Sequence, residues 1–337
     1  MVTRSKITSI GSYIPEKVYT NFDLEEILDT SDEWIKQRTG IEQRHWANPS
    51  QSTSDLALEA SLDAINKSGI NKSEIDMIIF ATLSPDHDFP GSACFLQTKL
   101  ELENIPTLDI RQQCSGFIYG LSIADNFICS NQYKNILLVG AEIHSKGLDK
   151  TPQGRNVSVL FGDGAGAAII SATEVNSVEN DAHIIKSHLH ADGKYAKELW
   201  LPAPGYAFPS DRITPLMLEE GLHYPQMNGK KVFTHAVKKM CETLINICKD
   251  TNININDIDA FFFHQANLRI NSKVAEILEI PESKIFNTIQ KYGNTTAATI
   301  PIGMADAAEE NFLKPGMLVA CVAFGSGFTW GSTILRY

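Results

Sequence analysis

Two pairs of apolar segments, far apart in this chain, resemble each other in the same order. Residues 74–80 (EIDMIIF) are matched by residues 257–263 (DIDAFFF), and residues 136–140 (ILLVG) by residues 318–322 (LVACV). Apolar runs of this length are typical of strands that are buried on both faces of a parallel sheet. The repetition predicts two similar α/β halves in one chain, and chance similarity between buried strands is the alternative.

Helical periodicity precedes each copy of the first segment. Residues 53–68 and 232–249 carry apolar side chains at helical spacing, which predicts two amphipathic helices. The stretch 172–181 is polar and predicts the seam between the halves. We therefore divide the chain into an N-terminal half, residues 1–175, and a C-terminal half, residues 176–337.

The charge and the cysteines narrow the classes of protein to consider. The formal net charge is −11 and no basic run occurs, which argues against general nucleic-acid binding. The six cysteines form no C-x-x-C pair and show no Cys/His metal spacing, so we expect no metal site and a reducing compartment. No signal-peptide pattern occurs, and no apolar run approaches the ~20 residues of a membrane helix. We expect a cytoplasmic protein without a membrane contact.

Cys114 stands between an apolar strand, residues 105–110, and a helical pattern that begins at Phe117. A strand-to-helix turn would place its sulfur at a helix N-terminus, where partial positive charge and free N–H groups favour a thiolate. A thiolate is the form that attacks carbonyl carbons. A buried structural cysteine is the alternative, and this segment alone leaves it open.

Three segments of the C-terminal half carry further candidates. His264 ends the second buried run, at the strand edge where α/β sheets bind ligands, and Cys114 occupies the equivalent edge of the first half. Asn294 directly precedes a predicted helix at 297–309 and is either a polar site residue or a helix cap. The small residues of 324–331 (FGSGFTWG) either expose backbone N–H groups beside a reacting carbonyl or form a simple turn.

Together these motifs resemble those of the ketoacyl-acyl-carrier-protein synthase III family, the condensing enzymes that start fatty acid synthesis. The matching segments follow the family's order over nearly the whole chain: 32–41, 114–117, 161–166, 264–270, 292–295 and 324–331. The resemblance implies a homodimer with the thiolase fold, which is α/β, with five αβαβα layers built from two related halves. The FGDGAG run at 161–166 lacks the G-K-[ST] ending of a phosphate loop, so we interpret it as close backbone packing.

The resemblance also implies a mechanism with a Cys114, His264 and Asn294 triad. Cys114 takes an acyl group from acyl-coenzyme A, which is a substrate, so no cofactor is expected. Malonyl on acyl carrier protein then decarboxylates and attacks the acyl-cysteine, giving 3-oxoacyl carrier protein, coenzyme A and carbon dioxide. His264 and Asn294 would donate hydrogen bonds to the malonyl thioester oxygen, and the backbone N–H groups of Cys114 and Ser326 would bind the oxyanion.

Contacts with coenzyme A, the carrier protein and the partner subunit are implied by the same resemblance. The residues that would bind coenzyme A are Trp34, Arg38, Arg155 and Asn267. A stacked tryptophan and arginine, here Trp34 and Arg155, suit a flat adenine ring. Arg269 matches a position for carrier-protein docking, and Phe89 one that crosses the dimer to line the partner's acyl pocket.

The chain departs from the family pattern at several positions. Gln112 and Gln113 precede the cysteine where small residues are common, and Ser326 stands where a glycine is usual. The segment 201–227 is rich in proline and glycine and longer than usual, which predicts a loop or lid over a pocket. These departures leave open a relative of secondary metabolism or one that takes a longer or unusual acyl starter. A cysteine thioesterase and a binding protein with a structural cysteine are further alternatives.

Overall fold

The protein is described here by a computed structural model that covers residues 2–177, 179–209 and 211–337. Three residues lie outside the described ones: Met1, Val178 and Ser210. Met1 falls in the predicted N-terminal half 1–175, Val178 in the predicted seam 172–181, and Ser210 in the predicted loop 201–227.

The first sheet has five strands in the order β1-β7-β6-β4-β5. These strands are β1 Val2–Tyr13, β4 Met77–Ala81, β5 Thr107–Ile110, β6 Asn135–Glu142 and β7 Gly164–Val175. β4 pairs in parallel with β5 and β6, whereas β7 runs antiparallel to β6 and β1. Every residue of β4 is buried, which explains its continuous apolar sequence.

The second sheet has the order β11-β12-β13-β8. Its strands are β8 His183–Ala191, β11 Ala260–Phe263, β12 Leu318–Gly325 and β13 Thr329–Arg336. β11 and β12 pair in parallel, and β13 is antiparallel to both β12 and β8, so this sheet repeats the arrangement of β4, β6, β7 and β1. Ile285 forms an isolated parallel bridge to Phe261, on the side where β5 flanks β4 in the first sheet. The division at residue 175 stays a prediction.

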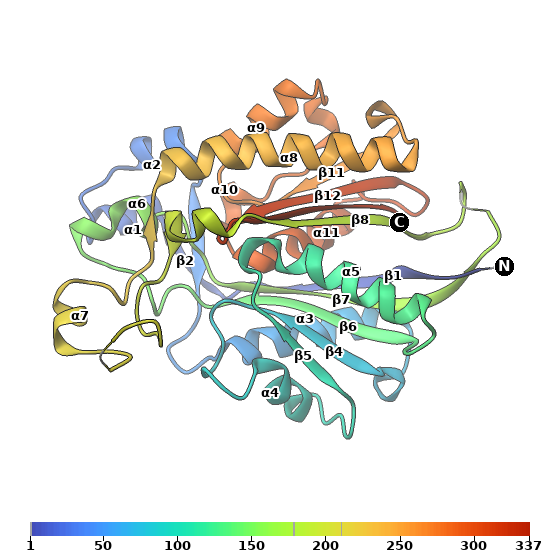
Figure 1. The fold of residues 1–337 in the computed structure, drawn as a ribbon, viewed down its shortest axis with the longest axis horizontal. Helices are drawn as coiled ribbons and strands as arrows, with labels where there is room; N and C mark the ends of the chain where they lie inside the picture. Colours follow the sequence, from blue (N-terminus) through green and yellow to red (C-terminus); the bar gives the residue numbers. More distant parts are fainter. Residues whose placement is uncertain (1, 178, 210) are drawn as a thin grey trace.

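Helices form three layers around the two sheets (Figure 1). The main helices are α3 Thr53–Ser68, α4 Ser92–Lys99, α5 Gly116–Cys129, α8 Gly229–Thr251, α9 Leu268–Ile277 and α11 Thr299–Glu309. α3 and α4 cover one face of the first sheet, α8 and α9 cover one face of the second, and α5 and α11 lie between the sheets. The predicted αβαβα order is confirmed, and α3 has the bounds that the sequence predicted.

Shorter elements gather at one side of the layers, on the left in Figure 1. The helices among them are α1 Asn21–Glu25, α2 Asp32–Thr39, α6 Arg155–Ser158, α7 Pro215–Glu219 and α10 Ile289–Tyr292. Two small antiparallel strand pairs also lie here. One consists of β2 Lys17–Thr20 and β3 Gln43–Trp46, and the other of β9 Leu199–Trp200 and β10 Gln226–Met227. The 3₁₀ turns are η1 Lys72–Glu74, η2 Gln113–Ser115, η3 Pro152–Gly154, η4 Gly193–Glu198, η5 Ile255–Asp257, η6 Glu282–Lys284 and η7 Thr296–Ala298.

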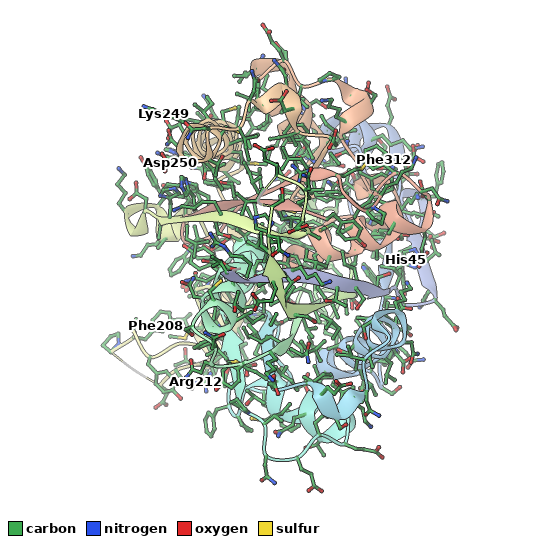
Figure 2. All side chains as sticks on the ribbon, turned by 90° about the vertical axis from the view of Figure 1, so that its right-hand side faces the viewer. His45, Phe208, Arg212, Lys249, Asp250 and Phe312 are labelled. Atoms are coloured by element: carbon green, nitrogen blue, oxygen red, sulfur yellow. The ribbon has the colours of Figure 1, made fainter. Side chains whose placement is uncertain are left out.

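The described part of the 201–227 segment is mostly irregular and lies outside the layers. Figure 2 shows the loop with Phe208 and Arg212 standing out from the body of the protein. Arg212 forms an ion pair with Asp88 and packs on the ring of Tyr206, which ties this loop to the one that follows β4. Across the described residues, no helix is both long enough and apolar enough to span a bilayer.

Candidate active site

Cys114, His264 and Asn294 line a single cavity of about 640 Å³. Cys114 lies in η2, between β5 and α5, and His264 follows β11 directly. Asn294 precedes η7 and α11, so the second half repeats the turn-to-helix arrangement that carries Cys114 in the first half. The structure thus brings together three residues that are 150 and 30 positions apart in sequence.

The turn that carries Cys114 is held by small residues and hydroxyl groups. Ser115 donates its hydroxyl to the carbonyl of Gln112 at 2.9 Å, and its Oγ lies 2.8 Å from Oγ1 of Thr329. A β-carbon at Gly116 would lie 2.9 Å from the β-carbon of Ala81, so only glycine fits between this turn and β4. Cys114 is therefore buried on a rigid support.

The protonation of Cys114 corrects one expectation from the sequence. Burial, together with the nearby carboxyl of Glu142, raises the pKa of the Cys114 thiol to about 12. The backbone N–H groups of Cys114 and Ser326 lie against the sulfur and lower the pKa, by less than burial raises it. The thiolate that we predicted from the helix start is wrong for the free protein, because desolvation of the sulfur outweighs those N–H groups. A base must accept the proton when the sulfur reacts.

The turn between β12 and β13 forms one wall of the cysteine site. Gly325 leaves no room for a side chain, because a β-carbon there would lie 3.1 Å from Sγ of Cys114. Ser326, which stands where a glycine is usual, donates its hydroxyl to the carbonyl of Leu199 and so turns its side chain away from the sulfur. Thr329 donates to the Ser326 carbonyl at 3.0 Å and links this turn to Ser115. The Ser326 N–H is left facing the sulfur.

His264 is a buried, neutral imidazole with one ring nitrogen fixed. Its Nδ1 lies 2.7 Å from Oγ1 of Thr299, and burial lowers the pKa of His264 to about 3. Its Nε2 is buried and has no hydrogen-bond partner among the described residues. Thr299 also lies 3.1 Å from the carbonyl of Thr296. When Thr299 donates to that carbonyl, Nδ1 carries the ring hydrogen and Nε2 is a base; when Thr299 donates to Nδ1, Nε2 carries the hydrogen and is a donor.

Asn294 is fixed through its backbone and its side-chain oxygen. Its N–H donates to the carbonyl of Leu160 at 2.8 Å, and its carbonyl accepts from the N–H of Gly162 at 3.1 Å. Its Oδ1 accepts from the N–H of Thr296 at 2.9 Å, which assigns Nδ2 as the amide donor that faces away from that bond. A β-carbon at Gly162 would lie 2.2 Å from the carbonyl oxygen of Tyr292, which confirms close backbone packing at residues 161–166.

Most of the residues expected to bind coenzyme A lie at this cavity. Trp34, Arg38 and Asn267 line it, and Asn267 donates its side-chain amide to the carbonyl of Arg38 at 2.9 Å. The guanidinium carbons of Arg38 and Arg155 lie 4.9 Å and 4.7 Å from the centre of the Trp34 ring. An adenine between Trp34 and Arg155 therefore requires Arg155 to move away. Arg269, the expected carrier-protein contact, also lines the cavity.

Phe89 does not line this cavity in its own subunit. It lies in the loop between β4 and α4, where its side chain is 80% exposed. Burying a phenylalanine side chain stabilises a protein by about 1.5–3 kcal/mol, so a ring left this exposed is unusual. Its position agrees with the expectation that it reaches another subunit, which stays a prediction.

Glu142, Thr296 and Thr299 were not identified from the sequence. The Glu142 carboxylate, at the end of β6, accepts from Ser84 Oγ at 2.6 Å and from the N–H groups of Leu83 and Ser84 at 3.1 Å. Burial raises the pKa of Glu142 to about 7. A charged residue that ends a buried strand was the available signal. Among the residues described, no group of three or more His, Cys, Asp or Glu is placed to hold a metal ion.

Comparison with known proteins places the chain in one family. A family model described as 3-oxoacyl-[acyl-carrier-protein (ACP)] synthase III matches residues 108–193, and the model of its C-terminal part matches residues 248–337. A beta-ketoacyl-[acyl-carrier-protein] synthase III of Caldanaerobacter subterraneus subsp. tengcongensis is 44% identical, covering 98% of this chain and 97% of the relative. One from Clostridioides difficile is 42% identical, covering 100% and 99%.

A solved structure gives the same result. The crystal structure of 3-oxoacyl-[acyl-carrier-protein] synthase III from Aquifex aeolicus VF5 is 39% identical in sequence and has a TM-score of 0.89, covering 99% of this chain and 100% of that one. The fold is the thiolase fold that the resemblance implied. The chain belongs to the 3-oxoacyl-[acyl-carrier-protein] synthase III family.

Proposed function

We propose that this protein condenses an acyl group from acyl-coenzyme A with malonyl-acyl carrier protein, giving 3-oxoacyl carrier protein, coenzyme A and carbon dioxide. This reaction initiates fatty acid biosynthesis, and we place it in the cytoplasm. The observation that carries the proposal is the composition of one cavity. It holds a cysteine sulfur against two backbone N–H groups. Beside the sulfur are two neutral side chains, His264 and Asn294, each with a polar nitrogen that has no hydrogen-bond partner among the described residues.

The first half-reaction transfers the acyl group to Cys114. The sulfur bonds to the thioester carbon while its proton passes to Nε2 of His264, which is a base when Nδ1 carries the ring hydrogen. The N–H groups of Cys114 and Ser326 stabilise the oxyanion that forms. The bond from the acyl carbon to the coenzyme A sulfur then breaks, and that sulfur leaves with the proton as a free thiol.

The second half-reaction needs hydrogen-bond donors and no protein nucleophile. The bond between the malonyl α-carbon and its carboxyl carbon breaks, carbon dioxide leaves, and the electron pair forms a thioester enolate. Nδ2–H of Asn294 and Nε2–H of His264 donate to the enolate oxygen, His264 being in its other neutral form. The enolate carbon attacks the acyl carbonyl on Cys114, and the sulfur leaves as a thiolate, which takes up one proton from solvent to restore the thiol. Both donors are buried and neutral. Water therefore does not compete for their hydrogen bonds when negative charge develops on the enolate oxygen.

Substrate binding is assigned to the mouth of the cavity. Trp34, Arg38 and Asn267 would contact coenzyme A, with Arg155 stacking on the adenine after it moves from Trp34. We place the carrier-protein contact at Arg269, whose guanidinium carbon lies 5.7 Å from the ring centre of Phe233 on α8.

We further propose that the enzyme is a homodimer. β5 is an edge strand whose outer side pairs with no strand among the residues that the structure describes, and such edges favour pairing with another chain. Phe89 and Tyr206 are 80% and 82% exposed, and their loops are joined by the Asp88–Arg212 ion pair. A second subunit would bury these rings, with Phe89 lining the partner's acyl pocket.

The test is the intact mass of the protein after acetyl-coenzyme A and then after malonyl-acyl carrier protein. The proposal expects one acetyl group on Cys114 that is stable in buffer and is removed by the malonyl donor with release of 3-oxoacyl carrier protein. Loss of the acetyl group to water would indicate a thioesterase instead, and no adduct would leave only a binding protein. Cys321→Ala, at a second fully buried cysteine, is the matched control for Cys114→Ala.

A further inference from the structure

We propose that Thr296 is the positioning residue that orients Asn294 and His264, the enolate donor pair, relative to each other. This inference rests on the proposed function, since it concerns the group that stabilises the enolate. Thr296 is the first residue of η7 and is fully buried. Its φ is +52°, in the left-handed region that β-branched residues rarely adopt. Such a conformation persists only where the surrounding structure enforces it.

The two backbone polar groups of Thr296 reach one donor each. Its N–H donates to Oδ1 of Asn294 at 2.9 Å, which directs Nδ2 of that amide. Its carbonyl lies 3.1 Å from Oγ1 of Thr299, and that hydroxyl lies 2.7 Å from Nδ1 of His264. Thr299 donates to the Thr296 carbonyl while His264 is a base, and this arm is a packing contact while Thr299 donates to Nδ1. Because the N–H and the carbonyl flank a single α-carbon, the dihedral angles of Thr296 fix the orientation of the two arms relative to each other.

The Thr296 hydroxyl accounts for how this conformation is held. Its Oγ1 lies 2.6 Å from Nε2 of His144, a buried histidine. The backbone N–H of His144 donates to Asp163 at 2.7 Å, and its ring centre lies 4.4 Å from that of Phe161. Phe161 in turn bridges to Asn294, so residues 161–166 support the turn from both sides. Burial lowers the pKa of His144 to about 3, so this contact stays neutral over the working pH range.

The rest of η7 is packed too tightly to shift as a unit. A β-carbon at Gly140, on β6, would lie 2.6 Å from the carbonyl oxygen of Ala297, the next residue in the turn. A β-carbon at Gly116, beside Cys114, would lie 3.4 Å from the β-carbon of Ala297. The turn that positions the donor pair therefore packs directly against the turn that carries the nucleophile.

Two substitutions separate the hydroxyl from the shape of the side chain. Thr296→Val keeps the branched shape but leaves Nε2 of His144 buried without its partner, so the left-handed turn loses the contact that holds it. Thr296→Ser keeps the hydroxyl and should rescue the wild-type behaviour. Thr288→Val is the matched control, because Thr288 is also buried and its hydroxyl forms no hydrogen bond within the described residues.

The experiment measures release of labelled carbon dioxide from malonyl-acyl carrier protein beside acylation of Cys114 by acetyl-coenzyme A, with thermal unfolding as a check. Misplacing catalytic groups by about 1 Å costs up to roughly 10²-fold in rate. For Thr296→Val we expect the kcat of carbon dioxide release to fall by about that factor with KM unchanged. Acylation should fall less, because it does not use Asn294 and depends on Thr296 only through Thr299 and His264.

The outcomes are distinguishable. Normal carbon dioxide release by a folded Thr296→Val protein would overturn the inference, as would an equal loss of both half-reactions or a Thr296→Ser protein as impaired as Thr296→Val. If Thr296→Val does not fold, Thr299→Val removes the His264 arm alone, and unchanged carbon dioxide release there would also overturn it. A wild-type protein that releases no carbon dioxide from the malonyl donor would refute the proposed function itself.

Discussion

Gly325 and Cys114 approach so closely that a β-carbon at Gly325 would lie 2.6 Å from the β-carbon of Cys114. Gly325 ends β12 in the second sheet, whereas Cys114 follows β5 in the first. The two halves of the fold therefore meet at the nucleophile, and each half supplies one of the two N–H groups at its sulfur.

Gly325→Ala should block acylation of Cys114. The added methyl group must push the Cys114 turn away from the Ser326 N–H, and overpacking of this kind typically costs about 1–3 kcal/mol of stability. We expect the acylation rate to fall far more than the folded fraction, as measured by intact mass over time beside urea unfolding. Gly193→Ala is the control, because a β-carbon there meets nothing within 4 Å. A Gly325→Ala protein that is acylated at the wild-type rate would contradict this geometry.

Glu142→Gln should lower the pH at which Cys114 reacts with iodoacetamide. The negative charge of Glu142 raises the pKa of the thiol, so removing that charge lowers the pKa and shifts the labelling profile toward lower pH. Peptide mapping after brief labelling across a pH series measures the shift. Asp125→Asn is the control, because the Asp125 carboxylate accepts a hydrogen bond from Cys129. This variant should leave the labelling profile of Cys114 unchanged. No shift, or a shift upward, for Glu142→Gln would argue against this coupling.

His264→Gln should make the stability of the protein less sensitive to acid. Burial lowers the pKa of His264 to about 3 from 6.5, so between these values the unfolded chain binds a proton that the folded protein does not. Stability is therefore lost as pH falls below 6.5, by at most about 1.4 kcal/mol per pH unit for one group. Buried Glu142, with its pKa raised to about 7, opposes this slope, so the comparison is between variant and wild type.

Urea unfolding at several pH values between about 4 and 6 gives this slope. The slope of the unfolding free energy against pH should be smaller in the variant than in the wild type, by up to about 1.4 kcal/mol per pH unit. His87→Gln is the control, since an exposed histidine meets water in both states. Identical slopes for His264→Gln and wild type would mean that His264 is not held neutral by burial.

Phe89→Ala should change the preferred length of the acyl group, because the missing ring would enlarge the partner's pocket. The kcat/KM values for a series of acyl-coenzyme A starters measure this, and light scattering gives the oligomeric state. Phe22→Ala, at another exposed phenylalanine, should leave the preference unchanged. An active monomer at working concentration would rule out the crossing of Phe89 between subunits.

Local sequence patterns predicted the elements that depend on local chemistry. The amphipathic run 53–68 is α3, and the run 232–249 lies within α8, because the spacing of apolar side chains along a helix is a local property. The family resemblance, and no local pattern, implied that Cys114, His264 and Asn294 share one cavity. What escaped prediction depends on packing between the halves. The high pKa of Cys114 arises mainly from burial in the folded protein, and the left-handed Thr296 opposes the local preference of threonine.

The most direct test of the account compares Cys114→Ala with Asn294→Ala in the two half-reactions. Cys114→Ala should accept no acetyl group from acetyl-coenzyme A yet still release carbon dioxide from malonyl-acyl carrier protein, since decarboxylation needs no protein nucleophile. Asn294→Ala should be acetylated, while its carbon dioxide release falls by about 10²–10³, the usual cost of losing one oxyanion donor. Labelled carbon dioxide and intact mass are measured for each variant. If Asn294→Ala decarboxylates normally but cannot be acetylated, the assignment of the two donor sites is wrong.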